Sequence, residues 1–242
     1  MTPITILQSA GEARPDWVSR CMKSVADWSQ RQGYSYHCIG DELFDWVTPG
    51  LRAKLRNRTP ILADLARLRW MESKLAARGG LVVWVDADTL VVDPSWRLPD
   101  SEHAFFGEEC WVQPTAEGTW RAYHSPHNAL MGFTAASPVL GFLAYLSESI
   151  IERADATHIA PQMVGPKLLK ALNNLAQFTL VPEAGAVSPQ LLEEWVSAAG
   201  PATTCYERAA RTPLALVNLC SSLVHSEEAV RQVEQFVARH GA

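Results

Sequence analysis

The sequence predicts an α/β fold, with a mostly parallel central sheet flanked by helices, in a single domain over residues 1–242. Two features favour this fold. The chain opens with a strand–helix–strand pattern, and a later uninterrupted apolar segment has the character of a strand buried on both faces. The 242 residues are 48% hydrophobic, which is enough for one sizeable core, and no repeat, low-complexity segment or linker divides them.

The opening of the chain predicts a βαβ unit. Ile4 to Leu7 is a short apolar run and a candidate first strand. From Pro15 onwards, apolar residues recur at three- and four-residue spacing as far as residue 28, which gives a helix one apolar face. Gly33 is expected to end that helix, and residues 34–40 form the second strand.

A second helix leads into the buried strand. Thr59 is expected to cap this helix, with Pro60 at its first position, and Gly79-Gly80 ends it. The sequence Leu-Val-Val-Trp-Val at 81–85 then runs on without a polar break, as in a central strand of a parallel sheet. Asp86 and Asp88 follow at the carboxyl end of that strand, where open α/β sheets bind their ligands.

The rest of the chain is less regular. Candidate strands cover residues 104–107, 129–134 and 178–181. A helix is expected from Ser137-Pro138 to about residue 153, and a short one follows Gly165-Pro166 and extends through residue 172. An amphipathic helix over 226–240 closes the chain.

Composition excludes several classes of protein. The formal net charge is -5 and no basic run occurs, so the chain lacks the electrostatic signature of a nucleic-acid-binding protein. The five cysteines are odd in number and form no CxxC pair, so we expect buried, reduced thiols in a cytoplasmic protein. The beginning of the sequence has no signal-peptide pattern, and the longest apolar stretch, residues 132–146, is too short to span a bilayer. Peripheral association with a membrane complex stays open, as does the oligomeric state.

The strongest local signal is Asp86-Ala87-Asp88. Two carboxylates two residues apart would repel a diphosphate, but a divalent cation between them reverses the sign of that interaction. Mg²⁺ and Mn²⁺ both suit carboxylate and phosphate oxygens. We therefore expect Asp86 and Asp88 to bind Mn²⁺ or Mg²⁺, which would neutralise charge on a departing diphosphate. The alternative is that both aspartates only cap a turn.

A longer pattern surrounds this motif. Asp64-Leu65-Ala66-Arg67 on a helix, then Gly79-Gly80, a hydrophobic strand and Asp86-Ala87-Asp88 resemble the glycosyltransferase superfamily with a sugar-binding region containing a DXD motif. This resemblance implies the GT-A fold. It also implies transfer of a hexose from a UDP- or GDP-sugar to a saccharide or other hydroxyl acceptor, with retention of anomeric configuration, as in polysaccharide biosynthesis.

The resemblance also implies roles for individual residues. Asp64 and Arg67 would contact the nucleotide or the donor sugar, and Arg67 would join the two DXD aspartates in catalysis. A guanidinium supplies fixed donors to oxygen ligands, and a carboxylate can orient sugar hydroxyls. The alternative for Asp64 and Arg67 is an ordinary ion pair on one helix face.

Three more residues have roles by the same resemblance. Asn128 lies in a segment similar to the GT-A strand whose asparagine faces the sugar, and its amide can both donate and accept. Gln8, just after the first strand, would lie near the nucleotide base, and His225 would be a further metal ligand. The alternatives are a turn residue for Asn128 and a capping residue for His225.

Two other functions fit part of the sequence. Asp86-Ala87-Asp88-Thr89-Leu90-Val91 also matches the nucleophile motif of haloacid-dehalogenase-like phosphatases, with Asp86 as nucleophile and Asp88 as acid/base. That motif normally lies on the first strand and is followed by a later acidic pair, and this chain has neither feature. The other alternative is a sugar-binding protein that kept the GT-A fold without turnover.

Overall fold

The computed structural model describes residues 2–155, 159–160 and 162–241. In this part of the chain, a six-stranded sheet has the order β2-β1-β3-β6-β5-β7, and a three-stranded sheet has the order β4-β9-β8. The strands of the larger sheet are β1 (Ile4–Ser9), β2 (Ser35–Ile39), β3 (Leu81–Val85), β5 (Ala104–Pro114), β6 (Trp120–Thr134) and β7 (Thr179–Val181). Those of the smaller sheet are β4 (Thr89–Val91), β8 (Ala184–Ala186) and β9 (Leu216–Asn218).

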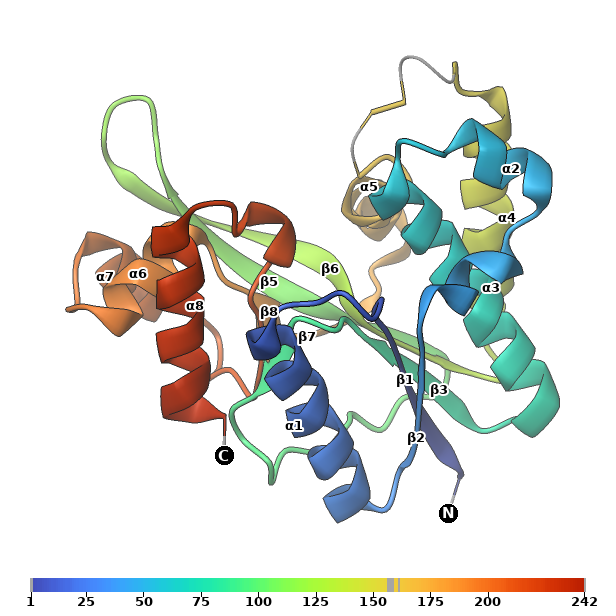
Figure 1. Cartoon of the computed structure of the whole chain (residues 1–242), viewed down its shortest axis with the longest axis horizontal. Coiled ribbons are helices and arrows are strands. Elements are labelled where there is room, and N and C mark those ends of the chain that lie inside the picture. The colour runs from blue at the N-terminus through green and yellow to red at the C-terminus, as the bar shows by residue number, and fades with distance from the viewer. Residues whose placement is uncertain (1, 156–158, 161, 242) are drawn as a thin grey trace.

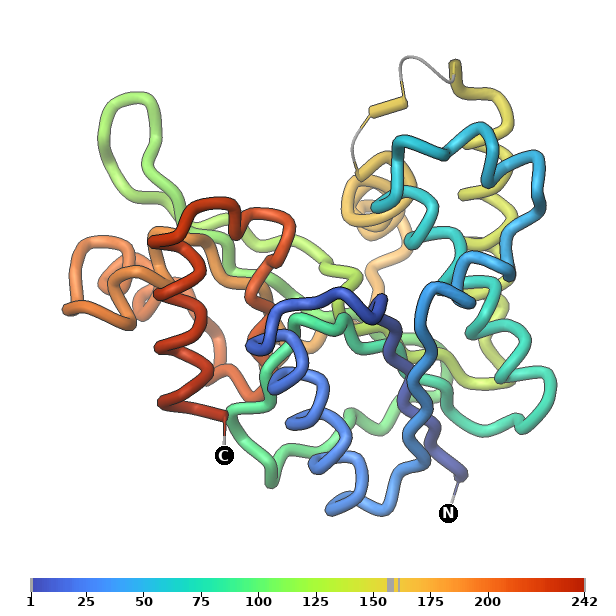
Figure 2. The backbone as a smooth tube through the Cα atoms, viewed as in Figure 1, coloured from blue at the N-terminus to red at the C-terminus, as the bar shows by residue number. Residues whose placement is uncertain are grey.

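The helices gather in two groups on either side of the β5–β6 hairpin (Figure 1). One group comprises η1 (Asp41–Trp46), α2 (Pro49–Lys54), α3 (Thr59–Arg78), α4 (Val139–Arg153) and α5 (Pro166–Ala176). The other comprises α6 (Pro189–Val196), α7 (Pro201–Ala209), η2 (Ser221–Leu223) and α8 (Glu227–His240). α1 (Asp16–Gln32) lies between β1 and β2 in sequence and beside α8 in space, as the backbone trace in Figure 2 also shows.

The buried strand β3 shows why the sheet has two covered faces. Every residue of β3 is buried, and its side chains alternate between two cores. Val82 and Trp84 pack with apolar residues of α3, whereas Val83 and Val85 pack on the opposite face with residues of α1 such as Trp28. A strand covered on both faces needs no polar alternation, and this explains the continuous apolar run.

The predicted α/β fold is confirmed, and the sheet is mixed. β1 pairs in parallel with β2 and with β3, and β5 pairs in parallel with β7. β6 runs antiparallel to both of its neighbours, β3 and β5. Among the described residues, no helix has both the length and the apolar character that crossing a membrane requires.

Several local expectations hold and others need correction. Gly33 ends α1 in the left-handed conformation, as predicted. Thr59 is not the cap of α3, because the helix begins at Thr59 itself and Arg58 precedes it without a capping hydrogen bond. The five cysteines are free, but the expectation that all are buried is wrong, since Cys38 is exposed. β5 and β6 are much longer than the predicted segments and form a hairpin whose tip projects away from α6 and α7 (Figure 1).

The centre of the sheet depends on one glycine. Gly132 of β6 pairs with Val83 of β3 and with Phe105 of β5, and a Cβ atom at position 132 would lie 2.1 Å from the Phe105 ring. Phe105 is fully buried, so its ring has no free space into which to move. Only a residue without a side chain allows this close packing.

We predict that Gly132→Ala lowers the free energy of unfolding by about 1–3 kcal/mol, the usual cost of overpacking a core. Urea unfolding measures this. Gly50→Ala is the matched control, because a Cβ there meets no described atom within 4 Å and alanine favours a helix. Equal unfolding free energies for Gly132→Ala and wild type would contradict this packing.

Candidate functional site

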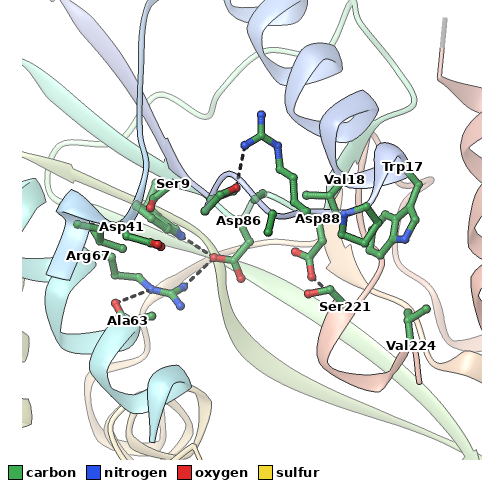
Figure 3. A pocket seen from close by; sticks show the side chains of 18 of the residues that line it. Ser9, Trp17, Val18, Asp41, Ala63, Arg67, Asp86, Asp88, Ser221 and Val224 are labelled. Carbon is green, nitrogen blue, oxygen red and sulfur yellow. Dashed lines mark hydrogen bonds and ion pairs between the residues drawn. The ribbon is translucent and has the colours of Figure 1, made fainter. Parts of the chain in front are cut away.

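A cavity of about 460 Å³ opens at the carboxyl end of β3. Asp86 and Asp88 line it, together with the loop after β1, the start of α1, parts of η1 and α3, and the η2–α8 segment. The segments come from both helix groups, so the fold closes the site from two sides (Figures 1 and 3). The volume lies within the range of small-molecule sites.

Arg67 lies within a buried cluster of acidic side chains. Its Nη1 lies 2.8 Å from Oδ1 of Asp86, and its Nη2 lies 2.9 Å from Oδ1 of Asp64. The guanidinium also lies over the Trp84 ring, 5.0 Å from the ring centroid. Arg67 is only 8% exposed, so desolvation strengthens each of these interactions. Its charge is therefore shared between two carboxylates before any ligand binds.

Asp86 uses one oxygen internally. Oδ1 accepts hydrogen bonds from Arg67 and, at 2.6 Å, from the indole Nε1 of Trp84. No hydrogen bond or ion pair joins Oδ2 to the residues described here, and Figure 3 shows the carboxylate facing the cavity. Trp84 and Asp86 are two residues apart, so they lie on the same face of the strand end. The arrangement fixes Asp86 while leaving one oxygen for a ligand.

Asp88 is held by the C-terminal part of the chain. Its Oδ1 accepts from the amide of Asn218 at 2.6 Å, and its Oδ2 accepts from the backbone N–H of Ser221 at 2.7 Å. Burial and the nearby charge of Asp86 raise the pKa of Asp88, and the hydrogen bonds from Ser221 and Asn218 oppose that shift. Neither donor is charged, so these hydrogen bonds do not offset the negative charge of the ionised Asp88 carboxylate.

Asp64 and Asn128 lie below the cavity surface. The Asn128 side-chain amide donates to Asp64 Oδ1 at 2.9 Å, and the Asn128 backbone carbonyl accepts from Arg67 Nη1 at 3.3 Å. Gly165, before α5, covers both, because a Cβ there would lie 2.5 Å from an Asp64 oxygen. Neither residue is among those that line the cavity. They form a buried support for Arg67.

Gln8 and His225 also lie apart from the cavity lining. Gln8 is fully buried, donates to the backbone carbonyl of Asp86 at 3.1 Å and accepts from the Tyr36 hydroxyl at 2.8 Å. His225 is exposed and precedes Ser226, the N-cap of α8. Within the described residues, no group of three or more His, Cys, Asp or Glu side chains is arranged to hold a metal ion.

The donor set still suits a divalent cation that shares its coordination with a ligand. Asp86, Asp88 and Asp64 bring three carboxylates to one guanidinium, so negative charge is in excess when all are ionised. Mg²⁺ and Mn²⁺ are commonly held by one or two carboxylates, with waters and phosphate oxygens completing the coordination. Asp86 and Asp88 are the residues that would hold such an ion.

Sequence reasoning missed three contributors to this site. Trp84 belongs to the predicted strand over residues 81–85, and the two-residue period of a strand places its indole on the same face as Asp86. Asn218 and Ser221 had no local signal. They reach Asp88 from more than 100 residues away through the pairing of β9 with β4.

Comparisons with known proteins show the fold. No protein-family model and no curated protein sequence matches the chain. A crystal structure of a glycosyltransferase involved in the glycosylation of the major capsid of PBCV-1 is similar, with a TM-score of 0.54 and 13% sequence identity. The match covers 96% of this chain and 98% of that one. The chain therefore has a fold that is also found in a glycosyltransferase.

Asp64 provides a pH test of the buried cluster. Desolvation raises the pKa of Asp64 from 3.8 to about 6, although Arg67 opposes the shift. Between these values the folded chain retains a proton that the unfolded chain releases. This group therefore stabilises the fold most at low pH, and its contribution is lost as the pH rises through about 6.

We predict that the unfolding free energy of Asp64→Asn minus that of wild type rises by on the order of 2–3 kcal/mol as the pH is raised from about 4 to about 7. Urea unfolding of both proteins across this range gives the difference. Asp93→Asn is the control: Asp93 is exposed, and hydrogen bonds from Ser95 lower its pKa, so its effect should be flat over the same range. A difference between Asp64→Asn and wild type that does not change with pH would contradict the raised pKa.

Proposed function

We propose that the chain is a metal-dependent glycosyltransferase with a GT-A fold. It would transfer a hexose from a UDP- or GDP-sugar to a saccharide or other hydroxyl acceptor. The observation that carries this proposal is the pair Asp86 and Asp88, which line one cavity at the end of β3 in a fold shared with a glycosyltransferase. Retention of anomeric configuration follows only from the family resemblance.

The charges in the cavity support a diphosphate ligand held through a cation. Mn²⁺ or Mg²⁺, when bound, would act as a Lewis acid toward the diphosphate. Asp86 would offer Oδ2 and Asp88 a remaining lone pair, while Arg67 keeps Asp86 in position from below. Arg14 also lines the cavity and would supply a further positive charge to the diphosphate.

We propose indirect roles for Asp64 and Asn128. Their contacts with each other and with Arg67 keep the guanidinium aligned between Asp64 and Asp86. Gln8 similarly supports the backbone of Asp86. Each of these residues would therefore influence donor binding by positioning the residues that line the cavity. His225 remains a proposed metal ligand that would have to turn toward the site from its exposed position.

The chemical step would depend mainly on stabilising the leaving group and on orientation. The bond between the sugar C1 and the diphosphate oxygen would break, the acceptor oxygen would bond to C1, and the acceptor proton would pass to the departing diphosphate. No strong protein nucleophile is needed when charge on the leaving diphosphate is stabilised in a preorganised site.

We predict that Asp88→Asn weakens Mn²⁺-dependent binding of UDP or GDP by more than about 100-fold, because losing a direct ligand should cost more than losing a residue that only orients one. Isothermal titration with and without Mn²⁺ measures this, and circular dichroism checks the fold. Asp93→Asn is the matched control, because it removes an exposed aspartate that does not line the cavity. Unchanged Mn²⁺-dependent binding in Asp88→Asn would refute the metal role.

A donor panel tests the reaction itself. The protein is incubated with nucleotide sugars and Mn²⁺, with and without acceptors, and release of the nucleoside diphosphate is followed. Acceptor-dependent release supports transfer. Binding without release under all conditions would indicate a sugar-binding protein, and hydrolysis of phosphate monoesters through a covalent Asp86 intermediate would establish the phosphatase alternative.

A further inference from the structure

The segment from β9 to η2 makes a set of hydrogen bonds with Asp88. The Asn218 amide donates to Oδ1 at 2.6 Å, and the Ser221 backbone N–H donates to Oδ2 at 2.7 Å. The backbone N–H of Leu219 donates to the Asp88 carbonyl at 3.0 Å. Both side-chain oxygens and the backbone of this aspartate are thus fixed by one short stretch of chain.

The Asn218 side chain is buried and makes hydrogen bonds through both its amide nitrogen and its amide oxygen. It is 4% exposed and lies opposite Thr89 in the antiparallel pair of β9 and β4. Its Nδ2 also donates to the Thr89 hydroxyl at 3.2 Å, and its Oδ1 accepts from the backbone N–H of Cys220 at 3.1 Å. Both amide hydrogens are therefore used within the protein, so Asn218 has no donor left for a ligand.

The turn after Asn218 completes the arrangement. Cys220 has a φ of 49°, the left-handed conformation that residues other than glycine and asparagine rarely adopt. This turn brings the N–H of Ser221 to the second oxygen of Asp88. The Asn218 side chain supports the turn through its bond to Cys220, so the two donors to Asp88 depend on the same residue.

We propose that Asn218 is a positioning residue of the cation site, which holds Asp88 in its ligating orientation without binding the cation itself. The inference rests on the proposed function. The groups that donate to the Asp88 oxygens belong to Asn218 and Ser221 and are neutral, so the carboxylate charge is undiminished. A carboxylate has about four lone-pair sites, more than these donors occupy. Asp86 differs, because the guanidinium of Arg67 already offsets its charge. Asp88 is therefore the stronger anchor for a cation, and its orientation sets the affinity.

The test measures binding of Mn²⁺ itself, in the presence of UDP, by electron paramagnetic resonance of the free ion. We expect Asn218→Ala to raise the Mn²⁺ concentration at half-saturation by about 10- to 100-fold, the usual cost of losing an outer-shell partner. Binding should be recovered at high Mn²⁺, because Asp88 is still present. Val217→Ala is the matched control: Val217 is its neighbour in β9, buried in the core, and its loss should lower the melting temperature and leave Mn²⁺ affinity unchanged.

Thr89→Val is a second variant that keeps the shape of the strand. It removes only the hydroxyl that holds the other amide hydrogen of Asn218, so we expect a smaller loss of Mn²⁺ affinity in the same direction. If Asn218→Ala binds Mn²⁺ with wild-type affinity, the inference is wrong and the proposed function is unaffected. If Asn218→Ala does not fold, wild-type affinity in Thr89→Val has the same meaning. Loss of binding at every Mn²⁺ concentration in a folded Asn218→Ala would also overturn the inference, since that is the behaviour of a ligand. A wild-type chain that binds no Mn²⁺ would overturn the proposed function and the inference with it.

Discussion

One guanidinium among three carboxylates, at the end of a buried strand, is the interaction on which the site depends. Arg67 contacts Asp64 and Asp86 directly, and Asp88 lines the same cavity and forms no ion pair with the residues that the structure describes. Removing the cation of such a cluster would leave buried charges uncompensated, at a cost of about 3–5 kcal/mol. The remaining negative charge faces the cavity. The same cluster thus stabilises the strand end and leaves negative charge at the cavity.

The fold supports this cluster from three directions. The pairing of β5 with β6 is irregular at one point: Phe106 pairs with Met131, but the next residue, Gly107, pairs with His127. This irregularity lies next to Asn128, which donates a hydrogen bond to Asp64. Such bulges redirect side chains near functional sites. On the α5 side, Gly165 allows the backbone to approach Asp64 closely. On the third side, Asn218 of the C-terminal segment donates a hydrogen bond to Asp88.

The parts of the fold that sequence could predict are those with a local signature. β3 is a continuous apolar run, α1 has a strong apolar period, and α8 has Ser226 as a true N-cap, so all three are close to expectation. β4, β8 and β9 have three residues each, too few for any period to show. The outer halves of β5 and β6 were missed because, beyond the core, that hairpin is partly exposed and rich in polar residues. For the site, Asp86, Asp88 and Arg67 line the cavity, and the local sequence pattern pointed to them, whereas Asn218 is defined only by tertiary pairing.

We propose that Asp86 and Asp88 hold a nucleoside diphosphate through a divalent cation. The most direct test is a crystal structure grown with Mn²⁺ and UDP or GDP, with anomalous diffraction measured at the manganese edge. We expect one strong anomalous peak within ligand distance of Asp88 and the diphosphate, with the diphosphate in the cavity beside Asp86. A diphosphate bound there without the metal, or a manganese peak away from both aspartates, would contradict it.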